Sequence, residues 1–261
     1  MLYKEYVMPF DELFLTTIGD LHIGDKGFTK ESEKVLVEKI NSIFNNDNAF
    51  AFLNGDILNL ATRNSKSSPF EQTMNLEEQI DKAVELFYPT KDRILGAVDG
   101  NHEHRMADFS GYSPTVAVCS MLGIPYFKYT AVLDLKMGKK MREDRESTRV
   151  SYVLVFSHTT GGGKKVGSKI NRVDEMRTTT VTNADGYFGS HNHMLGAVPL
   201  ISKEYDSRNK CIIDRVQLLV DCGGYLQWDN SYPEKGQLQP FKVGSPTVIL
   251  NGKKKEMQVI L

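Results

Sequence analysis

Cysteine is scarce in this sequence and follows no metal-binding or redox pattern. Only three cysteines occur in 261 residues, and Cys119, Cys211 and Cys222 lie far apart and outside any C-x-x-C pair. Neither a disulfide framework nor a zinc knuckle is therefore indicated. We expect three reduced and buried thiols.

Long apolar runs and an excess of one charge are also missing. No stretch approaches the length that spans a bilayer, and Glu5, Asp11 and Glu12 precede any apolar run, unlike in a signal peptide. We therefore expect a cytoplasmic protein without a membrane partner. Lys and Arg number 32 against 33 Asp and Glu, so any contact with a polyanion would have to be local.

The length and composition fit one large globular domain. The chain is 40% hydrophobic and 25% charged, as is usual for soluble globular proteins, and an α/β domain of this length can bury a sizeable core. We find no internal repeat. The charged stretch 139–149 lies between two apolar segments and is expected to form an exposed hairpin tip. We predict a single domain over residues 1–261.

Short apolar runs alternate with helical patterns in the first half of the chain. Five runs that end in polar or glycine-containing turns are predicted to be buried strands: 13–18, 50–53, 94–98, 152–156 and 187–188. Helices are expected over 29–44, with Thr29 as N-cap, and from about Glu71 to Tyr88. Further strand-like segments at 130–136, 212–220, 247–250 and 257–261 make the second half richer in β structure.

A polar cluster follows each of the five predicted strands. In chain order the clusters are Gly19-Asp20-Leu21-His22, Gly55-Asp56, Gly100-Asn101-His102-Glu103, Ser157-His158 and Gly189-Ser190-His191-Asn192-His193. The loops at the carboxyl ends of strands converge in open α/β sheets, and the strands beneath hold them rigidly. We therefore expect the clusters to meet in space.

The side chains of these clusters are typical of a transition-metal site. Imidazole nitrogens with carboxylate and amide oxygens, but no thiolate, suit manganese, iron, zinc or nickel. Seven donors are too many for one tetrahedral ion and are about right for two ions that share a carboxylate. Two-metal centres with ions roughly 3.5–4 Å apart are a recurring solution for displacement at phosphate esters.

In this order, the motifs GDLH, GD, GNHE, His158 and HNH resemble the signature of the calcineurin-like metallophosphoesterase superfamily. The resemblance spans Asp20 to His193. It implies an α/β fold of two stacked mixed β-sheets flanked by helices, with a dinuclear metal site at strand carboxyl ends. It also implies that one ion is held by Asp20, His22 and His193, that the other is held by Asn101, His158 and His191, and that Asp56 bridges the two. His102 would stand unligated above the phosphate as the catalytic residue.

The sequence departs from the family pattern in two places. Ser190 is inserted after the usual glycine of the last motif, which leaves its histidines intact. The GDILN segment lacks the acid-Arg-Gly continuation of protein Ser/Thr phosphatases, which favours a bacterial or phage type. Among the possible ions manganese is preferred.

The predicted function is hydrolysis of phosphodiesters or phosphomonoesters by a water that two metal ions activate, with a nuclease as one specific form and a nucleotide or nucleic acid as substrate. Basic residues near the motifs are candidates for substrate binding: Lys164, Lys165, Arg63 and Arg105. The glycine-rich segment that contains the lysines lacks the spacing of a nucleotide P-loop. The alternative is a non-catalytic scaffold on the same fold, which predicts missing ligands, and none is missing.

Overall fold

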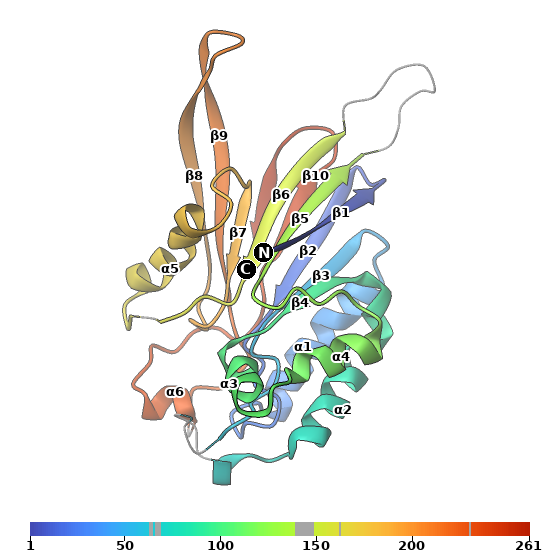
Figure 1. Ribbon diagram of the computed structural model, residues 1–261, viewed down its shortest axis with the longest axis vertical. Helices are drawn as coiled ribbons and strands as arrows, with labels where there is room; N and C mark the ends of the chain where they lie inside the picture. The colour runs from blue at the N-terminus through green and yellow to red at the C-terminus, as the bar shows by residue number, and fades with distance from the viewer. Residues whose placement is uncertain (63–64, 66–68, 139–148, 162, 230) are drawn as a thin grey trace.

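Two mixed β-sheets packed face to face organise the chain in the computed structural model (Figure 1). The structure describes residues 1–62, 65, 69–138, 149–161, 163–229 and 231–261. Arg63 and residues 139–148 of the predicted hairpin tip lie outside the described residues.

The five-stranded sheet has the order β11-β10-β2-β3-β4. Its strands are β2 (Glu12–Ile18), β3 (Ala49–Asn54), β4 (Ile94–Val98), β10 (Thr247–Asn251) and β11 (Met257–Ile260). Strands β2, β3 and β4 are parallel, whereas β10 is antiparallel to both of its neighbours. The carboxyl ends of three consecutive strands therefore meet at one edge, as predicted.

The six-stranded sheet has the order β1-β5-β6-β7-β9-β8. Its strands are β1 (Leu2–Met8), β5 (Thr130–Met137), β6 (Val150–Ser157), β7 (Gly186–Gly189), β8 (Leu195–Asp206) and β9 (Cys211–Cys222). Strands β6, β7 and β9 run parallel. The β8–β9 hairpin projects beyond the body of the molecule (Figure 1), and Cys211 lies exposed at its tip. The prediction of a buried thiol was therefore wrong for Cys211, whereas Cys119 and Cys222 are buried.

Helices cover the outer face of each sheet, so the layers run helix, sheet, sheet, helix (Figure 1). The helices are α1 (Lys30–Phe44), α2 (Leu76–Phe87), α3 (Asn101–Ser110), α4 (Pro114–Leu122), α5 (Val166–Thr179) and α6 (Tyr232–Lys235), with 3-10 turns η1 (Pro69–Glu71) and η2 (Tyr88–Arg93). Side chains of α1, α2 and α4 pack on the five-stranded sheet, and those of α5 pack on the other. This confirms the predicted architecture. None of the helices in the described ranges combines the length and hydropathy of a bilayer-crossing segment.

Local sequence accounts for the starts of α1 and α2. The Thr29 side chain accepts a hydrogen bond from the Ser32 N–H and begins α1 as predicted. The second helix starts later than predicted, at Leu76, because Asn75 and Glu78 form a capping box that satisfies two backbone N–H groups there. The predicted start at Glu71 falls instead in the turn η1.

The core between the sheets is built from their facing side chains. Phe52 of one sheet stacks on Phe156 of the other at a centroid distance of 4.1 Å, and Phe156 stacks on Phe188 at 4.5 Å. All three rings are buried. Full burial of an aromatic side chain of this size contributes about 1.5–3 kcal/mol, so this stack fixes the strand ends of β3, β6 and β7 against one another.

A polar tie joins the same three strand ends. The fully buried Asn54 amide donates to the Phe188 carbonyl at 3.1 Å and to the Ser190 hydroxyl at 2.9 Å. The backbone carbonyl of Asn54 in turn accepts a hydrogen bond from His158 Nδ1 at 3.0 Å. Asn54 thus holds the two sheets in register at the edge that carries the predicted site.

Replacing Asn54 by Ala should lower the free energy of unfolding by about 1–3 kcal/mol, because the Ser190 hydroxyl and a buried carbonyl lose their donor. Urea denaturation followed by circular dichroism measures the change. The exposed Asn41 of α1 provides the matched control, since Asn41→Ala should change stability by no more than about 0.5 kcal/mol. Equal stability of the two variants would show that the tie is dispensable.

Candidate metal centre

All seven predicted ligands lie at one edge of the two sheets. Asp20 and His22 follow β2, Asp56 follows β3, Asn101 begins α3 after β4, His158 follows β6, and His191 and His193 follow β7. With His102, the six aspartates and histidines among them form three overlapping groups, and the donor atoms of each group lie within 4.8 Å of one another. Both sheets therefore contribute to a single site.

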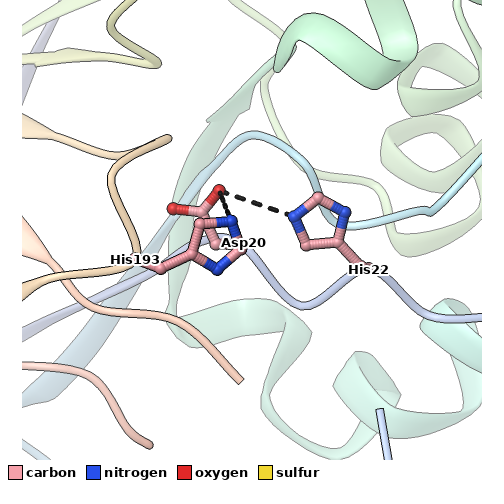
Figure 2. A group of neighbouring side chains, drawn as sticks. All are labelled: Asp20, His22 and His193. Carbon is pink, nitrogen blue, oxygen red and sulfur yellow. Dashed lines mark ion pairs between the residues drawn. The ribbon is translucent and has the colours of Figure 1, made fainter. Parts of the chain in front are cut away.

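The first group contains Asp20, His22 and His193 (Figure 2). Asp20 Oδ1 lies 3.7 Å from His22 Nε2 and 3.7 Å from His193 Nε2. Asp20 Oδ1 and His22 Nε2 are buried and have no hydrogen-bond partner among the described residues. Leaving such polar atoms unsatisfied costs about 1–3 kcal/mol each, and a cation between them would remove that cost. These atoms fit a divalent ion.

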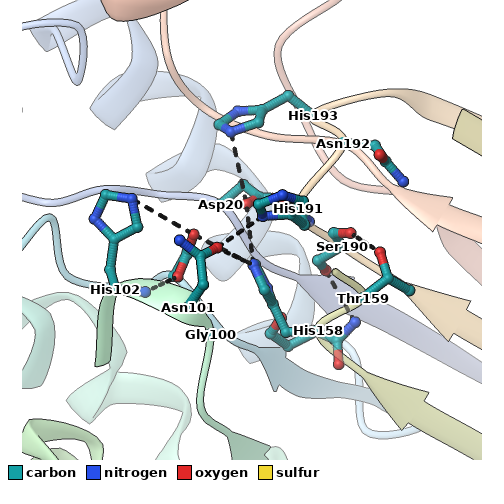
Figure 3. Close-up of polar contacts among 12 residues, drawn as sticks. Asp20, Gly100, Asn101, His102, His158, Thr159, Ser190, His191, Asn192 and His193 are labelled. Atoms are coloured by element: carbon teal, nitrogen blue, oxygen red, sulfur yellow. Dashed lines mark hydrogen bonds and ion pairs between the residues drawn. The ribbon is translucent and has the colours of Figure 1, made fainter. Parts of the chain in front are cut away.

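The second group contains Asp56, His158 and His191. Figure 3 shows Asn101 beside the two histidines of this group. His158 Nε2 lies 3.2 Å from Asp56 Oδ2. The amide oxygen of Asn101 lies 2.7 Å from His191 Nδ1 and 3.2 Å from His158 Nε2. Carboxylate, amide and two imidazoles therefore converge and can hold a second ion.

Asp56 links the two groups. Besides its contact with His158, its Oδ2 lies 3.8 Å from His22 Nε2, which belongs to the first group. Its Oδ1 accepts a hydrogen bond from the His102 N–H at 2.8 Å. A buried carboxylate with one oxygen facing both groups has the placement that a bridging ligand requires.

His102 sits over this bridge. Its Nδ1 donates to the Asn59 carbonyl, which leaves Nε2 facing the cavity, 3.8 Å from Asp56 Oδ2. With His22 and Asp56 it forms a third group of possible donors. Burial lowers the pKa of His102 to about 3, so the imidazole is neutral at pH 7 and its Nε2 bears a lone pair.

The backbone of the ligand residues is strained. Five of them have positive φ angles in the left-handed region: Asp20 at 50°, His22 at 51°, Asp56 at 49°, His191 at 80° and His193 at 53°. In residues other than glycine, this backbone conformation costs roughly 1–2 kcal/mol of free energy per residue. Strain of this kind gathers at functional sites, where the surrounding structure enforces it. Here it turns alternate side chains of each short loop toward the same point.

Glu103 holds the Asp56 loop against α3. Its fully buried carboxylate accepts hydrogen bonds from the backbone N–H groups of Asp56 at 3.0 Å, Leu58 at 3.0 Å and Gly100 at 2.8 Å. Burial raises the pKa of Glu103 to about 7, while the three donors favour the carboxylate form. A Cβ atom at Gly100 would lie 2.1 Å from Asp56 Oδ1, so only glycine allows this close approach.

The charges of the metal-free site compensate one another. Burial alone would lower the pKa of His158, but the carboxylates of Asp56 and Asp20 outweigh it and raise the pKa to about 10. Burial alone would raise the pKa of Asp20, but His193 and His22 lower it to about 2. His158 is therefore protonated at pH 7, and its positive charge offsets the buried carboxylates of Asp56 and Asp20.

A cavity of about 240 Å³ opens above the ligands. Residues outside the predicted set also line it: Asp25, Asn59, Thr160 and Gly161. Of the predicted substrate-binding residues, Arg105 lines the cavity, whereas Lys164 and Lys165 are exposed just before α5 and do not. Of these four residues, only Asn59 could have been identified from the sequence, because it follows Asp56 by three residues in the same buried loop.

Comparison with known proteins adds little to this site. No protein-family model and no curated protein matches the sequence. Among solved structures, the NAD nucleotidase NadN of Haemophilus influenzae is similar with 11% sequence identity and a TM-score of 0.41. The match covers 96% of this chain and 49% of that one, so the chain spans about half of its length. The interpretation of the site depends on its own geometry.

Glu103→Gln should lower the free energy of unfolding by about 1–3 kcal/mol, because an amide offers one acceptor oxygen where three N–H groups require two. Urea denaturation of the metal-free protein measures this change. Glu77→Gln, at an exposed position of α2, is the control and should stay within about 0.5 kcal/mol of wild type. A Glu103 variant as stable as this control would contradict the role of the carboxylate.

Metal binding should release a proton. His158 has an ordinary pKa of 6.5 and a pKa of about 10 in the folded protein. Its charge therefore stabilises the metal-free fold fully below 6.5, and the contribution is lost as the pH rises through about 10. A metal must displace this proton, so its affinity should rise with pH across this window.

Calorimetric titration of Mn²⁺ at pH 8, in buffers with different ionisation enthalpies, counts the released protons. We expect wild-type binding to release close to one proton, which comes from His158. His158→Gln should bind Mn²⁺ more weakly and should not release this proton. Wild-type binding that releases no proton at pH 8 would contradict the assigned protonation state.

Proposed function

We propose that the chain is a metal-dependent phosphoesterase of the calcineurin-like metallophosphoesterase superfamily. The observation that supports this most strongly is the pair of donor groups joined through Asp56, with unpartnered buried atoms on Asp20 and His22. Paired sites of this kind are a recurring solution for displacement at phosphate esters. The preferred metal is manganese, and the divergence from protein Ser/Thr phosphatases in the GDILN segment supports a bacterial or phage type.

The ligands would be shared as the resemblance implies, with Asp20, His22 and His193 on one ion, Asn101, His158 and His191 on the other, and Asp56 between them. Two bound ions would supply charge for the phosphoryl oxygens and lower the pKa of a water for attack on phosphorus. The chain holds its donors in place through the strained loops, Glu103 and Asn54.

His102 would handle the proton of the leaving group. Its Nδ1 is fixed on the Asn59 carbonyl, so Nε2 is the only ring nitrogen that can face a substrate. A phosphoester in the cavity brings negative charge next to Nε2 and favours its protonation. The imidazolium then donates to the phosphoryl group and passes its proton to the departing oxygen.

The substrate would be a phosphodiester or phosphomonoester, with a nuclease or an enzyme acting on nucleotides as specific forms. Arg105 is the substrate-binding candidate that the cavity supports. Lys164 and Lys165 lie outside it and would contact only a substrate that extends beyond the cavity.

Substitutions at His102 and Asp56 test the proposal. His102→Ala should keep its metal but lose turnover by about 10²- to 10⁴-fold, because proton transfer is lost. Asp56→Ala should lose both metal and turnover, because both donor groups share this carboxylate. The protein is stripped, reloaded with Mn²⁺ and analysed by mass spectrometry for metal content, then assayed on bis-p-nitrophenyl phosphate, p-nitrophenyl phosphate, and single- and double-stranded DNA.

The neighbouring His104 is the matched control. It packs against Tyr129 at a ring distance of 4.8 Å and does not line the cavity, so His104→Ala should turn over substrate at a rate close to wild type. Metal loss in His102→Ala would place His102 among the ligands, and full activity would remove its catalytic role. No hydrolysis of any substrate by the loaded wild type would favour a non-catalytic scaffold.

A further inference from the structure

Arg105 brings a fixed positive charge to the cavity. It follows Asn101 by four residues and His102 by three, so all three side chains share one face of α3. Among the described residues that line the cavity, Arg105 is the only lysine or arginine. The backbone of Arg105 therefore lies four residues, about 6 Å along the helix axis, beyond that of Asn101.

Two of the three guanidinium nitrogens of Arg105 lack partners: Nε and Nη2 are buried, and neither has a hydrogen-bond acceptor in the described part of the chain. Buried polar groups in proteins are normally paired, and an unpaired charged donor is especially costly. The planar guanidinium matches the oxygens of a phosphate better than any other side chain does. An anionic group entering the cavity would satisfy it.

Phe109 continues the same helical face. It lies four residues after Arg105, about 6 Å further along the axis, and its side chain is 86% exposed. A single exposed phenyl ring is unremarkable alone. Phe109, however, lies on the same helical face as Asn101 and Arg105. Its flat apolar ring is therefore spaced from Arg105 as one nucleotide is from the next. Bases stack on such rings with little regard to sequence.

We propose that α3 is a binding track for single-stranded nucleic acid. The scissile phosphodiester lies at the metal centre beside Asn101, the adjacent phosphate binds Arg105, and the base of that flanking nucleotide stacks on Phe109. The inference depends on the proposed phosphoesterase function and specifies its substrate.

Two features favour a single strand over a duplex. The net charge of the chain is −1, whereas duplex binding draws most of its affinity from a broad basic surface that neutralises many phosphates. The bases of a duplex are also stacked on one another, so they offer no free face to Phe109. A single strand needs only the one cation and the one ring that α3 provides.

Hydrolysis by the Mn²⁺-loaded protein of residues 1–261 tests the track. A short oligothymidylate carries neighbouring phosphates and bases, whereas bis-p-nitrophenyl phosphate carries neither. Phe109→Ser should lower kcat/KM on the oligonucleotide, relative to the small diester, by about 5- to 150-fold. Arg105→Gln should cause a relative loss of at least tenfold. It should also reduce the slope of log(kcat/KM) against log salt by about 0.7, since one phosphate contact disappears.

Altered substrates make the assignment specific. An oligonucleotide with a neutral methylphosphonate next to the scissile bond should lose the effect of Arg105→Gln, and one with an abasic flanking position should lose the effect of Phe109→Ser. Arg105→Lys should recover only part of the loss, because it restores charge without the planar fork. Circular dichroism and thermal melting establish that each variant is folded.

Arg208 and Phe44 provide matched controls, because both are exposed outside this face of α3. Arg208→Gln and Phe44→Ser should leave the preference for the oligonucleotide as it is in wild type. Equal losses on both substrates in the α3 variants would overturn the inference and assign Arg105 and Phe109 a structural role. Duplex DNA cleaved as well as the single strand, with the same sensitivity to both substitutions, would also overturn it.

The two proposals fail differently. A wild type that hydrolyses bis-p-nitrophenyl phosphate but shows no preference for the oligonucleotide would overturn the track and leave the phosphoesterase intact. If neither substrate is hydrolysed, the phosphoesterase proposal fails. Fluorescence anisotropy of a fluorescein-labelled oligothymidylate then decides the track: binding weakened by both α3 substitutions supports it, and binding unaffected by them overturns it.

Discussion

Burial of the Asp56 carboxylate is the constraint on which the rest of the site depends. The residue is only 1% exposed, and an isolated carboxylate in such a place would be very unfavourable. Its two oxygens are compensated differently: Oδ1 by the His102 N–H, and Oδ2 by the imidazoles of His158 and His22. Positive charge must therefore gather at this edge of the sheets, as protons on histidine or as metal ions.

The fold holds this unfavourable arrangement through contacts that do not touch the cavity. Glu103 fixes three backbone N–H groups around the Asp56 loop, and Asn54 ties the ends of β3 and β7. The hydrophobic stack of Phe52, Phe156 and Phe188 lies directly beneath them. The rigid strands and these contacts together enforce the strained backbone of five ligand-loop residues.

Helix α3 combines several tasks because its faces point in different directions. Asn101 and His102 begin it at the metal centre, and Glu103 turns inward to the Asp56 loop. One turn later Arg105 reaches the cavity, and Phe109 extends the same face into solvent. A single short helix therefore brings Asn101, His102 and Arg105 to the cavity and Glu103 to the Asp56 loop.

Helices α3, α4 and α5 escaped prediction for local reasons. The first begins within the GNHE motif and has few apolar residues, and the second is a short apolar segment after Ser113 and Pro114. The third follows a glycine-rich basic segment and has few apolar residues. Its buried side chains Val173 and Met176, which pack on the six-stranded sheet, therefore form only a weak helical pattern. In each case tertiary packing outweighs a weak local pattern.

The sequence by itself determined the donor types, their order and their position after buried strands, because short apolar runs and the polar turns that end them are local features. It also indicated that these polar turns would meet, because the loops at the carboxyl ends of strands converge in open α/β sheets. Only the tertiary structure decided that Asp56 stands between both donor groups, that Asn54 reaches Ser190, and that two buried guanidinium nitrogens of Arg105 have no acceptor among the described residues. These contacts depend on the order of strands in the sheets and on the packing of segments that can lie more than a hundred residues apart in the chain. No local sequence pattern encodes such packing.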